Sequence, residues 1–161
     1  DMILFMHFFS FLYIFFFSVA AASDLKIRSI IVLDNNVPSE CGLSFETTDI
    51  VSKVTIKKNR NGTSTVFNVQ SKKEILKSVN IITNSVNLNK LLDGKFIESK
   101  NILIESVTNE NETSSFFQEL LIGGAEMIIN DKNIDIMGPI DSKVRLEYLF
   151  CTGEMFLPNY N

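Results

Sequence analysis

An apolar run at the start of the chain divides the sequence into two parts of different character. All but four of the first 22 residues are apolar, the exceptions being Asp1, His7, Ser10 and Ser18. The same stretch holds half of the 14 phenylalanines in a chain of 161 residues. Without it the apolar share falls from 45% to about 39%, which is ordinary for a soluble domain. The sequence therefore predicts an apolar segment followed by one globular domain.

Residues 1–22 are predicted to be a signal peptide that directs export. The apolar run ends in Ala20-Ala21-Ala22, and the charged Asp24 follows closely. Signal peptidase accepts small residues at positions −1 and −3, so cleavage after Ala22 fits this pattern. The run is also about 20 residues long, which is enough to span a bilayer as an uncleaved anchor. With either outcome we expect the domain formed by residues 23–161 to be periplasmic or extracellular.

The two cysteines of the chain, Cys41 and Cys151, both follow this export segment. In an oxidising compartment an even pair of cysteines predicts a disulfide. A redox pair usually needs C-x-x-C spacing, and a metal site needs more ligands than two thiols. We therefore predict a structural bridge between an early strand and the last strand. Closing a loop of about 100 residues gains about 4.7 kcal/mol on the chain-entropy model.

Short stretches in which apolar and polar residues alternate predict that the domain is mainly β. The clearest of them flank Asn59-Arg60-Asn61-Gly62, where the Asn-Gly pair favours a hairpin turn. A second hairpin is expected around residues 131–133. The predicted strands cover residues 26–33, 43–46, 50–58, 63–69, 101–107, 126–130, 134–137 and 143–151.

Signals for helices are fewer than those for strands. Ser114 or Ser115 can cap a short helix that Gly123-Gly124 ends, and the loop before it is expected to cover residues 108–113. Leu88, Leu91 and Leu92 indicate a helical turn closed by Asp93-Gly94.

One segment is open to two interpretations. Ser71-Lys72-Lys73-Glu74 matches a capping box, which favours one or two helical turns as far as Val79. The β-branched residues from Val79 onward favour a strand instead.

The arrangement of these elements predicts an antiparallel fold. The strands follow one another at intervals of about 8–15 residues, and no βαβ rhythm is present. The expected fold is an antiparallel β-sandwich or partly open barrel with one or two short helices. Its last strand is predicted over residues 143–151, with Val144, Leu146, Tyr148 and Phe150 on one face.

The absence of histidine after residue 22 restricts the chemistry of the domain, since His7 is the only histidine in the chain. It excludes Ser-His-Asp and Cys-His nucleophilic catalysis and the common zinc sites. The remaining enzymatic hypothesis is a glycan hydrolase with two carboxylates flanking one cleft. Its candidates are Glu126, Asp135 and Glu147.

Asp131, Asn133 and Asp135 have the spacing of the first three ligands of a calcium loop. The sixth position of that loop should be glycine and is Ile136, and the twelfth should be glutamate and is Ser142. A hairpin turn with polar flanks explains the spacing better, so no metal and no cofactor are expected.

Two N-x-S/T triplets, which begin at Asn61 and Asn111, are possible glycosylation sites in surface loops. A basic patch at the first hairpin would contain Lys53, Lys57, Lys58 and Arg60. After residue 22 the chain has 15 basic residues and 18 acidic ones, which are the 19 of the whole chain less Asp1. Nucleic acid is therefore not an expected partner.

These observations favour an exported, non-enzymatic β-domain that acts as a binding or assembly module for a protein or glycan ligand. The membrane would be a partner only through residues 1–22, if that segment is retained. A carboxylate-dependent glycan hydrolase is the first alternative. The second is capture of a partner by β-strand addition, in which an exposed edge strand pairs with a strand of the partner.

Overall fold

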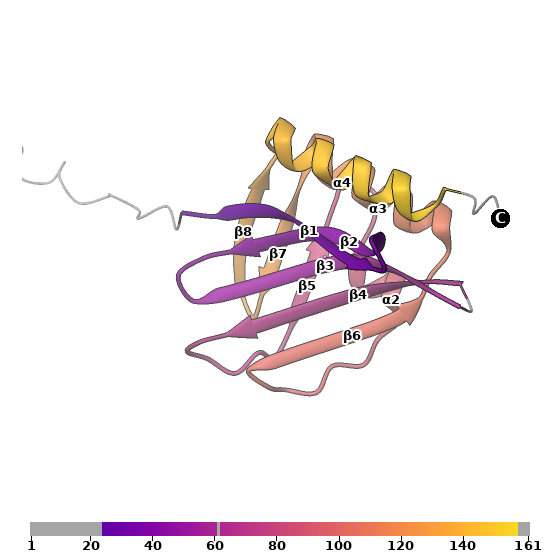
Figure 1. Cartoon of the computed structure of the whole chain (residues 1–161). Coiled ribbons are helices and arrows are strands. Elements are labelled where there is room, and N and C mark those ends of the chain that lie inside the picture. Colours follow the sequence, from indigo (N-terminus) through magenta and orange to yellow (C-terminus); the bar gives the residue numbers. More distant parts are fainter. Residues whose placement is uncertain (1–23, 61, 158–161) are drawn as a thin grey trace, which may run out of the picture.

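The computed structural model describes residues 24–60 and 62–157, which form two antiparallel sheets and three helices (Figure 1). The larger sheet has the strand order β1-β2-β3-β4-β6, and the smaller has the order β5-β7-β8. The strands are β1 (Lys26–Asp34), β2 (Val37–Glu46), β3 (Ile50–Asn59), β4 (Gly62–Ser71), β5 (Val79–Ile82), β6 (Asn101–Val107), β7 (Gly124–Ile129) and β8 (Lys132–Met137). The helices are α2 (Leu88–Leu92), α3 (Glu110–Gly123) and α4 (Ser142–Met155).

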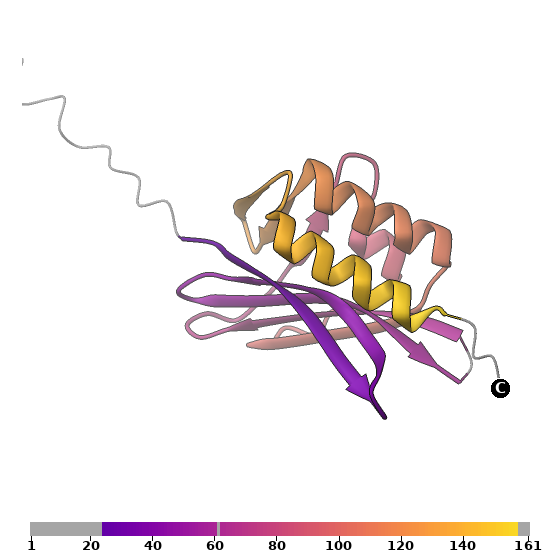
Figure 2. The same ribbon diagram turned by 45° about the horizontal axis from the view of Figure 1, so that its top comes forward.

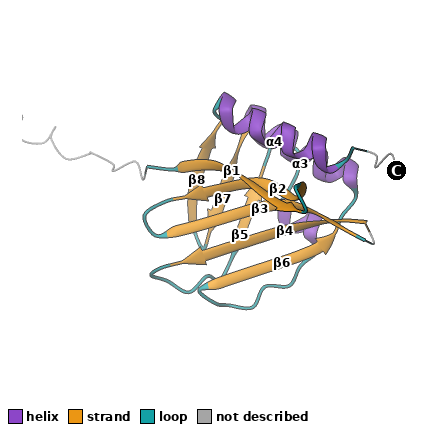
Figure 3. Cartoon of the chain, viewed as in Figure 1, coloured by secondary structure: helices purple, strands orange, loops and turns teal. Residues whose placement is uncertain are grey.

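This structure confirms a mainly β fold with antiparallel pairing, and within the described ranges neither sheet closes into a barrel (Figure 3). None of the helices in these ranges is long and apolar enough to cross a membrane. The predicted export segment, residues 1–22, and the glycosylation candidate Asn61 lie outside the described residues.

Both predicted hairpins are confirmed. β3 and β4 pair from Ile50↔Ser71 to Asn59↔Gly62, which places the connection between the strands within the predicted segment 59–62. β7 and β8 pair around a turn at Asn130, whose φ of 52° is in the left-handed region that asparagine tolerates better than most residues. The helical turn at Leu88–Leu92 is also confirmed, with Asp93 as its left-handed C-cap.

Alternation along the strands of the larger sheet gives it an apolar inner face and a polar outer face. The inner face contributes several fully or almost fully buried side chains to the core, among them Leu43, Phe45, Val54, Phe67 and Ile104. They pack with residues of all three helices and of the smaller sheet in one core cluster. The larger sheet therefore provides one wall of the core, and the helices and the smaller sheet provide the other.

Helices α3 and α4 lie side by side over the larger sheet and run in opposite directions (Figure 2). At one end, the Thr63 side chain donates to Glu110 at the start of α3 (3.0 Å), and the Lys58 ammonium donates to the carbonyl of Met155 at the end of α4 (2.8 Å). At the other end, the Ile140 amide donates to the Leu121 carbonyl (2.9 Å). The start of one helix is therefore next to the end of the other.

The disulfide between Cys41 and Cys151 is confirmed, but the element that carries Cys151 is a helix. The predicted last strand over residues 143–151 is therefore wrong, and α4 occupies that segment. The bridge joins α4 to β2, with the two Cα atoms 5.8 Å apart.

Two periodicities compete in this last segment. The buried residues of α4 are Val144, Tyr148, Cys151 and Met155, which recur at helical spacing. The strand prediction instead followed the local alternation that ends in Phe150, whose side chain is 70% exposed in the helix. Asp141 supports the helix because its carboxylate accepts hydrogen bonds from the amides of residues 143 and 144.

Helix α3 begins earlier than predicted. Residues 110–113 belong to it rather than to a loop, and its N-cap is Asn109 instead of Ser114 or Ser115. The Asn109 side chain accepts from the Asn111 amide (2.9 Å), and acidic residues in the first turn complement the helix dipole. The predicted end of this helix at Gly123-Gly124 is confirmed.

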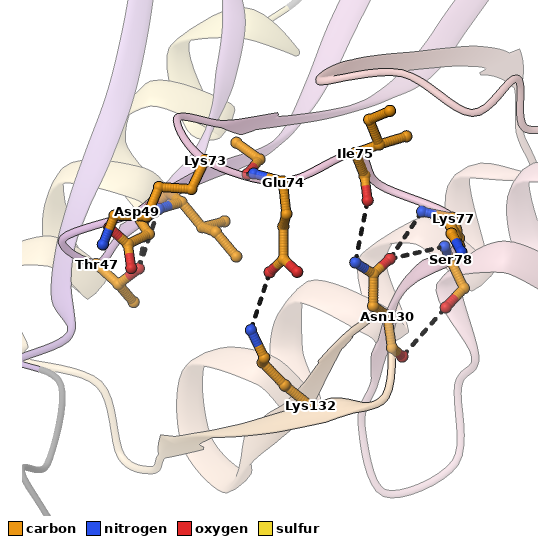
Figure 4. A network of polar contacts seen from close by, with 11 residues as sticks. Thr47, Asp49, Lys73, Glu74, Ile75, Lys77, Ser78, Asn130 and Lys132 are labelled. Carbon is orange, nitrogen blue, oxygen red and sulfur yellow. Dashed lines mark hydrogen bonds and ion pairs between the residues drawn. The ribbon is translucent and has the colours of Figure 1, made fainter.

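The segment between β4 and β5 forms no helix, which resolves the two interpretations of Ser71–Glu74. The Glu74 amide donates to the Ser71 hydroxyl (3.0 Å), as in a capping box. The Glu74 carboxylate, however, pairs with Lys132 across the molecule (3.1 Å) instead of folding back on Ser71 (Figure 4). Tertiary contacts therefore hold this segment in an extended path to β5.

Asn130, at the β7–β8 turn, supplies several of those contacts (Figure 4). Its side-chain oxygen accepts from the Lys77 amide (2.7 Å), and its side-chain nitrogen donates to the Ile75 carbonyl (3.1 Å). Its backbone amide donates to the Ser78 carbonyl (2.7 Å). One turn residue therefore holds the last residues before β5, from Ile75 to Ser78.

Candidate functional site

The carboxylates proposed for glycan hydrolysis lie on two different parts of the molecule. Glu126 and Asp135 are opposite each other on β7 and β8, and the Asn133 side chain donates a hydrogen bond to Glu126. Glu147 lies on α4, where it accepts from the Ser29 hydroxyl of β1. None of the three lines either of the two cavities described below.

The calcium-like triplet forms a hairpin. Asp131 is in the turn, while Asn133 and Asp135 are on β8 and alternate with apolar residues. The amide group of Asn133 is directed to Glu126, and among the described residues no three acidic, cysteine or histidine side chains gather closely enough to hold a metal ion.

The two remaining sequence features lie at one end of the fold. Asn111 is exposed in the first turn of α3, while Thr113 of the same triplet is buried. Part of the basic patch is neutralised, because Lys57 pairs with Glu105 (3.8 Å) and Lys58 binds the C-terminal end of α4. Glycosylation at Asn111 stays a prediction.

A groove with a volume of about 710 Å³ lies between α3 and α4. Four lining residues of α4 recur at helical spacing and form one wall: Arg145, Leu149, Thr152 and Phe156, the last of which follows directly after the helix. Four residues of α3 recur in the same way and form the other: Glu110, Ser114, Phe117 and Leu121. We call this cavity the α3–α4 groove.

The middle of the groove is apolar. Phe117 and Tyr148 stack across the two helices, with ring centroids 4.8 Å apart and an angle of 19° between the ring planes. Ile56 of β3 and Leu121 of α3 are buried beside them. This composition, apolar with a few polar groups, and this volume are typical of small-molecule sites.

Two side chains carry formal charge among those that line the groove, Glu110 and Arg145. They lie at opposite ends because α3 and α4 are antiparallel. Glu110 accepts the hydrogen bond from Thr63. Arg145 has a buried Nε with no hydrogen-bond partner, and no carboxylate of the described residues lies within ion-pair distance of its guanidinium. Among the described residues, no neighbouring carboxylate therefore balances the positive charge of Arg145.

Tyr148 is 5% exposed, and burial raises the pKa of its phenol well above the ordinary value of 10.0. The phenol is therefore neutral at physiological pH and can act as a hydrogen-bond donor.

A network of threonines fixes the end of the groove near Glu110. The Thr65 and Thr108 hydroxyls are 2.7 Å apart, and the Thr113 hydroxyl donates to Thr108 (2.8 Å). Thr65 and Thr113 are buried and Thr108 is half-buried, so this network joins β4 to the first turn of α3 largely inside the fold. It positions that helix wall against the sheet.

A second, more polar cavity of about 540 Å³ lies between the β5–α2 connection and the start of α3. Its lining includes Lys90, Glu112 and Asn87. Asn87 is already engaged as the N-cap of α2, where its side chain accepts from the Lys90 amide (3.2 Å). This cavity has less apolar surface to offer a ligand than the α3–α4 groove.

The sequence predictions missed the groove because one of its walls, α4, was predicted as a strand. Alternation placed Tyr148 beside Leu146 and Phe150, whereas the helix places it beside Val144 and Cys151. The helical spacing from Val144 to Met155 was the signal that could have found it.

No protein-family model, curated protein or solved structure matches this chain. The residues of the groove are therefore the basis on which a function can be assigned.

Proposed function

We propose that this protein is an exported, non-enzymatic binding module and that the α3–α4 groove is its ligand site. The observation that carries the proposal is the groove itself, which has an apolar floor, hydrogen-bonding groups along its rim and one uncompensated cation. Such a combination binds and orients a ligand.

Export is supported by two features. Residues 1–22 have the composition and the small-residue end of a signal peptide. The disulfide between Cys41 and Cys151 is buried, and bonds of this kind persist mainly in oxidising compartments.

A binding role is favoured over hydrolysis by the contents of the groove. Among the described residues Glu110 is the one carboxylate that lines the groove, and a glycosidase of the usual kind needs two on opposite sides of the bond to be cleaved. The carboxylates proposed from the sequence are outside the groove, with Glu126 and Glu147 both engaged in hydrogen bonds to neighbouring side chains.

Gly153 provides a direct test of the ligand site. It lines the groove, and a Cβ atom added there would meet no atom within 4 Å, so a larger side chain at this position enters open space. Gly153→Leu should therefore fill the groove without disturbing the fold. Gly123→Leu is the matched control, because Gly123 has equally open surroundings at the end of α3 and does not line the groove.

The probe is Nile red, a neutral apolar dye whose fluorescence rises on binding. We expect saturable binding to the exported protein and to Gly123→Leu, and at least about tenfold weaker binding to Gly153→Leu. Equal binding by Gly153→Leu and the wild type, with both melting at the same temperature, would exclude the groove as the ligand site.

Partner capture through β1 is a second candidate function. β1 is an outer strand of the larger sheet, and the end of β1 and the start of β2 expose Ile31, Val32, Leu33 and Val37. An exposed apolar edge is the kind of surface that accepts an added strand. If the captured strand belongs to a second copy of the chain, light scattering detects concentration-dependent self-association. Leu33→Lys should abolish this self-association and leave Nile red binding intact. Association that persists unchanged in this variant would remove the candidate.

A further inference from the structure

The two charged ends of the α3–α4 groove differ in how well their charges are satisfied. At one end the Glu110 carboxylate already accepts a hydrogen bond from Thr63. At the other, Arg145 is half-buried, its Nε has no partner, and no described carboxylate is close enough to pair with it. Because α3 and α4 are antiparallel, their dipoles oppose each other at both ends of the groove. The side chains therefore decide which end an anionic ligand group prefers.

A guanidinium in this state favours a carboxylate over a neutral ligand group. Its planar array of N–H donors matches the two oxygens of a carboxylate, and hydrogen bonds between ionised groups are shorter and stronger than neutral ones. Tyr148 lies three residues farther along α4 on the same wall, and its neutral phenol is a further donor for an anionic group.

The rest of the groove favours a single flexible apolar chain. From Arg145 to Phe156 the wall formed by α4 extends over 11 residues, or about 16 Å. Between these ends lie the Phe117–Tyr148 stack and the exposed side chain of Leu149. A groove of about 710 Å³ that extends over about 16 Å is on average about 7–8 Å wide. A helix with its side chains is about 10–12 Å wide, so a whole helix does not fit inside the groove.

We propose that the ligand of the α3–α4 groove is a single-chain amphipath with a carboxylate head, such as a medium-chain fatty acid. The head lies at Arg145, and the apolar chain follows the Phe117–Tyr148 stack toward Phe156. This inference rests on the proposed function and specifies the class of ligand and its orientation in the same groove.

The test compares decanoate with decanol, which have the same chain and differ in the head group. Calorimetric titration of the exported protein, with both probes kept monomeric, should give a Kd for decanoate that is lower by about tenfold or more. Arg145→Gln should remove this difference by weakening decanoate alone. Lys143→Gln is the matched control, since it removes a cation from the same turn of α4 but lies outside the groove and is highly exposed.

Each outcome separates the head-group assignment from the proposed function. Equal affinities of the wild type for decanoate and decanol would overturn the assignment of the head, and this result needs no variant. A preference for decanoate that Arg145→Gln retains, in a variant that melts as the wild type does, would overturn the role of Arg145. In both cases the groove remains the ligand site if Gly153→Leu abolishes Nile red and decanol binding. If the wild type binds none of the three probes, both proposals are wrong.

Discussion

Phe117 of α3 and Tyr148 of α4 stack face to face, and this pair joins the two helices beneath the α3–α4 groove. Tyr148 is almost completely buried where this stack lies, and burial raises the pKa of its phenol above the ordinary value of 10.0. Stability at high pH therefore reports on the floor of the proposed ligand site.

We predict that the protein loses stability as the pH rises above about 10 and that Tyr148→Phe reduces this loss. Burial raises the pKa of Tyr148 in the folded state above the ordinary value of 10.0, so above that pH the unfolded chain releases a proton that the folded protein retains. The stabilisation is complete below this value and decreases above it. Urea unfolding of both proteins at pH 8 and pH 11 measures the effect. An equal loss in the two proteins would contradict the prediction.

Acid should weaken the attachment of α3 to the β5–α2 connection. The hydroxyl of Ser85, followed by that of Thr83, lowers the pKa of Glu119 from its ordinary value of 4.5 by donating hydrogen bonds to the carboxylate. The contribution to stability is present above pH 4.5 and is lost as the pH falls through the lower pKa of the folded state.

Glu119→Gln should therefore lower the melting temperature at pH 7 and flatten its decrease on acidification. The matched control is Glu98→Gln at an exposed position, where the described residues form neither a hydrogen bond nor an ion pair with Glu98. Calorimetric scans between pH 3 and pH 7 make the comparison, and parallel curves for the wild type and Glu119→Gln would disprove the role of Glu119.

The two glycines at the junction of α3 and β7 should respond in opposite ways to alanine. Gly124 has a φ of 77°, and a Cβ atom there would lie 2.0 Å from the Ile136 carbonyl oxygen. Gly124→Ala should cost about 2–4 kcal/mol of unfolding free energy through strain and overpacking. Gly123 has open surroundings, so Gly123→Ala should leave the free energy of unfolding unchanged or raise it by up to about 1 kcal/mol. Chemical denaturation measures both, and similar losses in the two variants would refute this assignment.

Removal of the disulfide should have the largest effect. The double variant Cys41→Ala and Cys151→Ala loses a bridge between residues 110 positions apart, which corresponds to about 4–5 kcal/mol on the chain-entropy model. Denaturation with and without a thiol reductant provides the check. Reductant should lower the midpoint of the wild type and leave that of the double variant unchanged, and an insensitive wild type would contradict the expected role of the bridge.

The features predictable from the sequence are those that neighbouring residues determine. The Asn-Gly hairpin, the β7–β8 hairpin and the glycine end of α3 follow from turn and cap chemistry within a few residues. The disulfide was predictable because the chain has two cysteines and both follow the predicted export segment.

The features that escaped prediction depend on distant contacts. Glu74 pairs with Lys132, so the capping box at Ser71 starts no helix. The helix α4 carries an exposed Phe150 that extends the alternation of a strand, and its path is set by packing on β1 and β2 and by the bond to Cys41. The groove needs both α3 and α4, so the same error concealed the candidate site.

The position of the disulfide also determines what a protease can release. Every described element from β3 to α4 lies between or at the bonded cysteines, whereas β1 and the first part of β2 precede Cys41. A single cut in any loop between these cysteines leaves two fragments that remain covalently joined, and the two helices of the groove stay attached to the larger sheet. A protein of this design can thus be cut between Cys41 and Cys151 without losing either fragment.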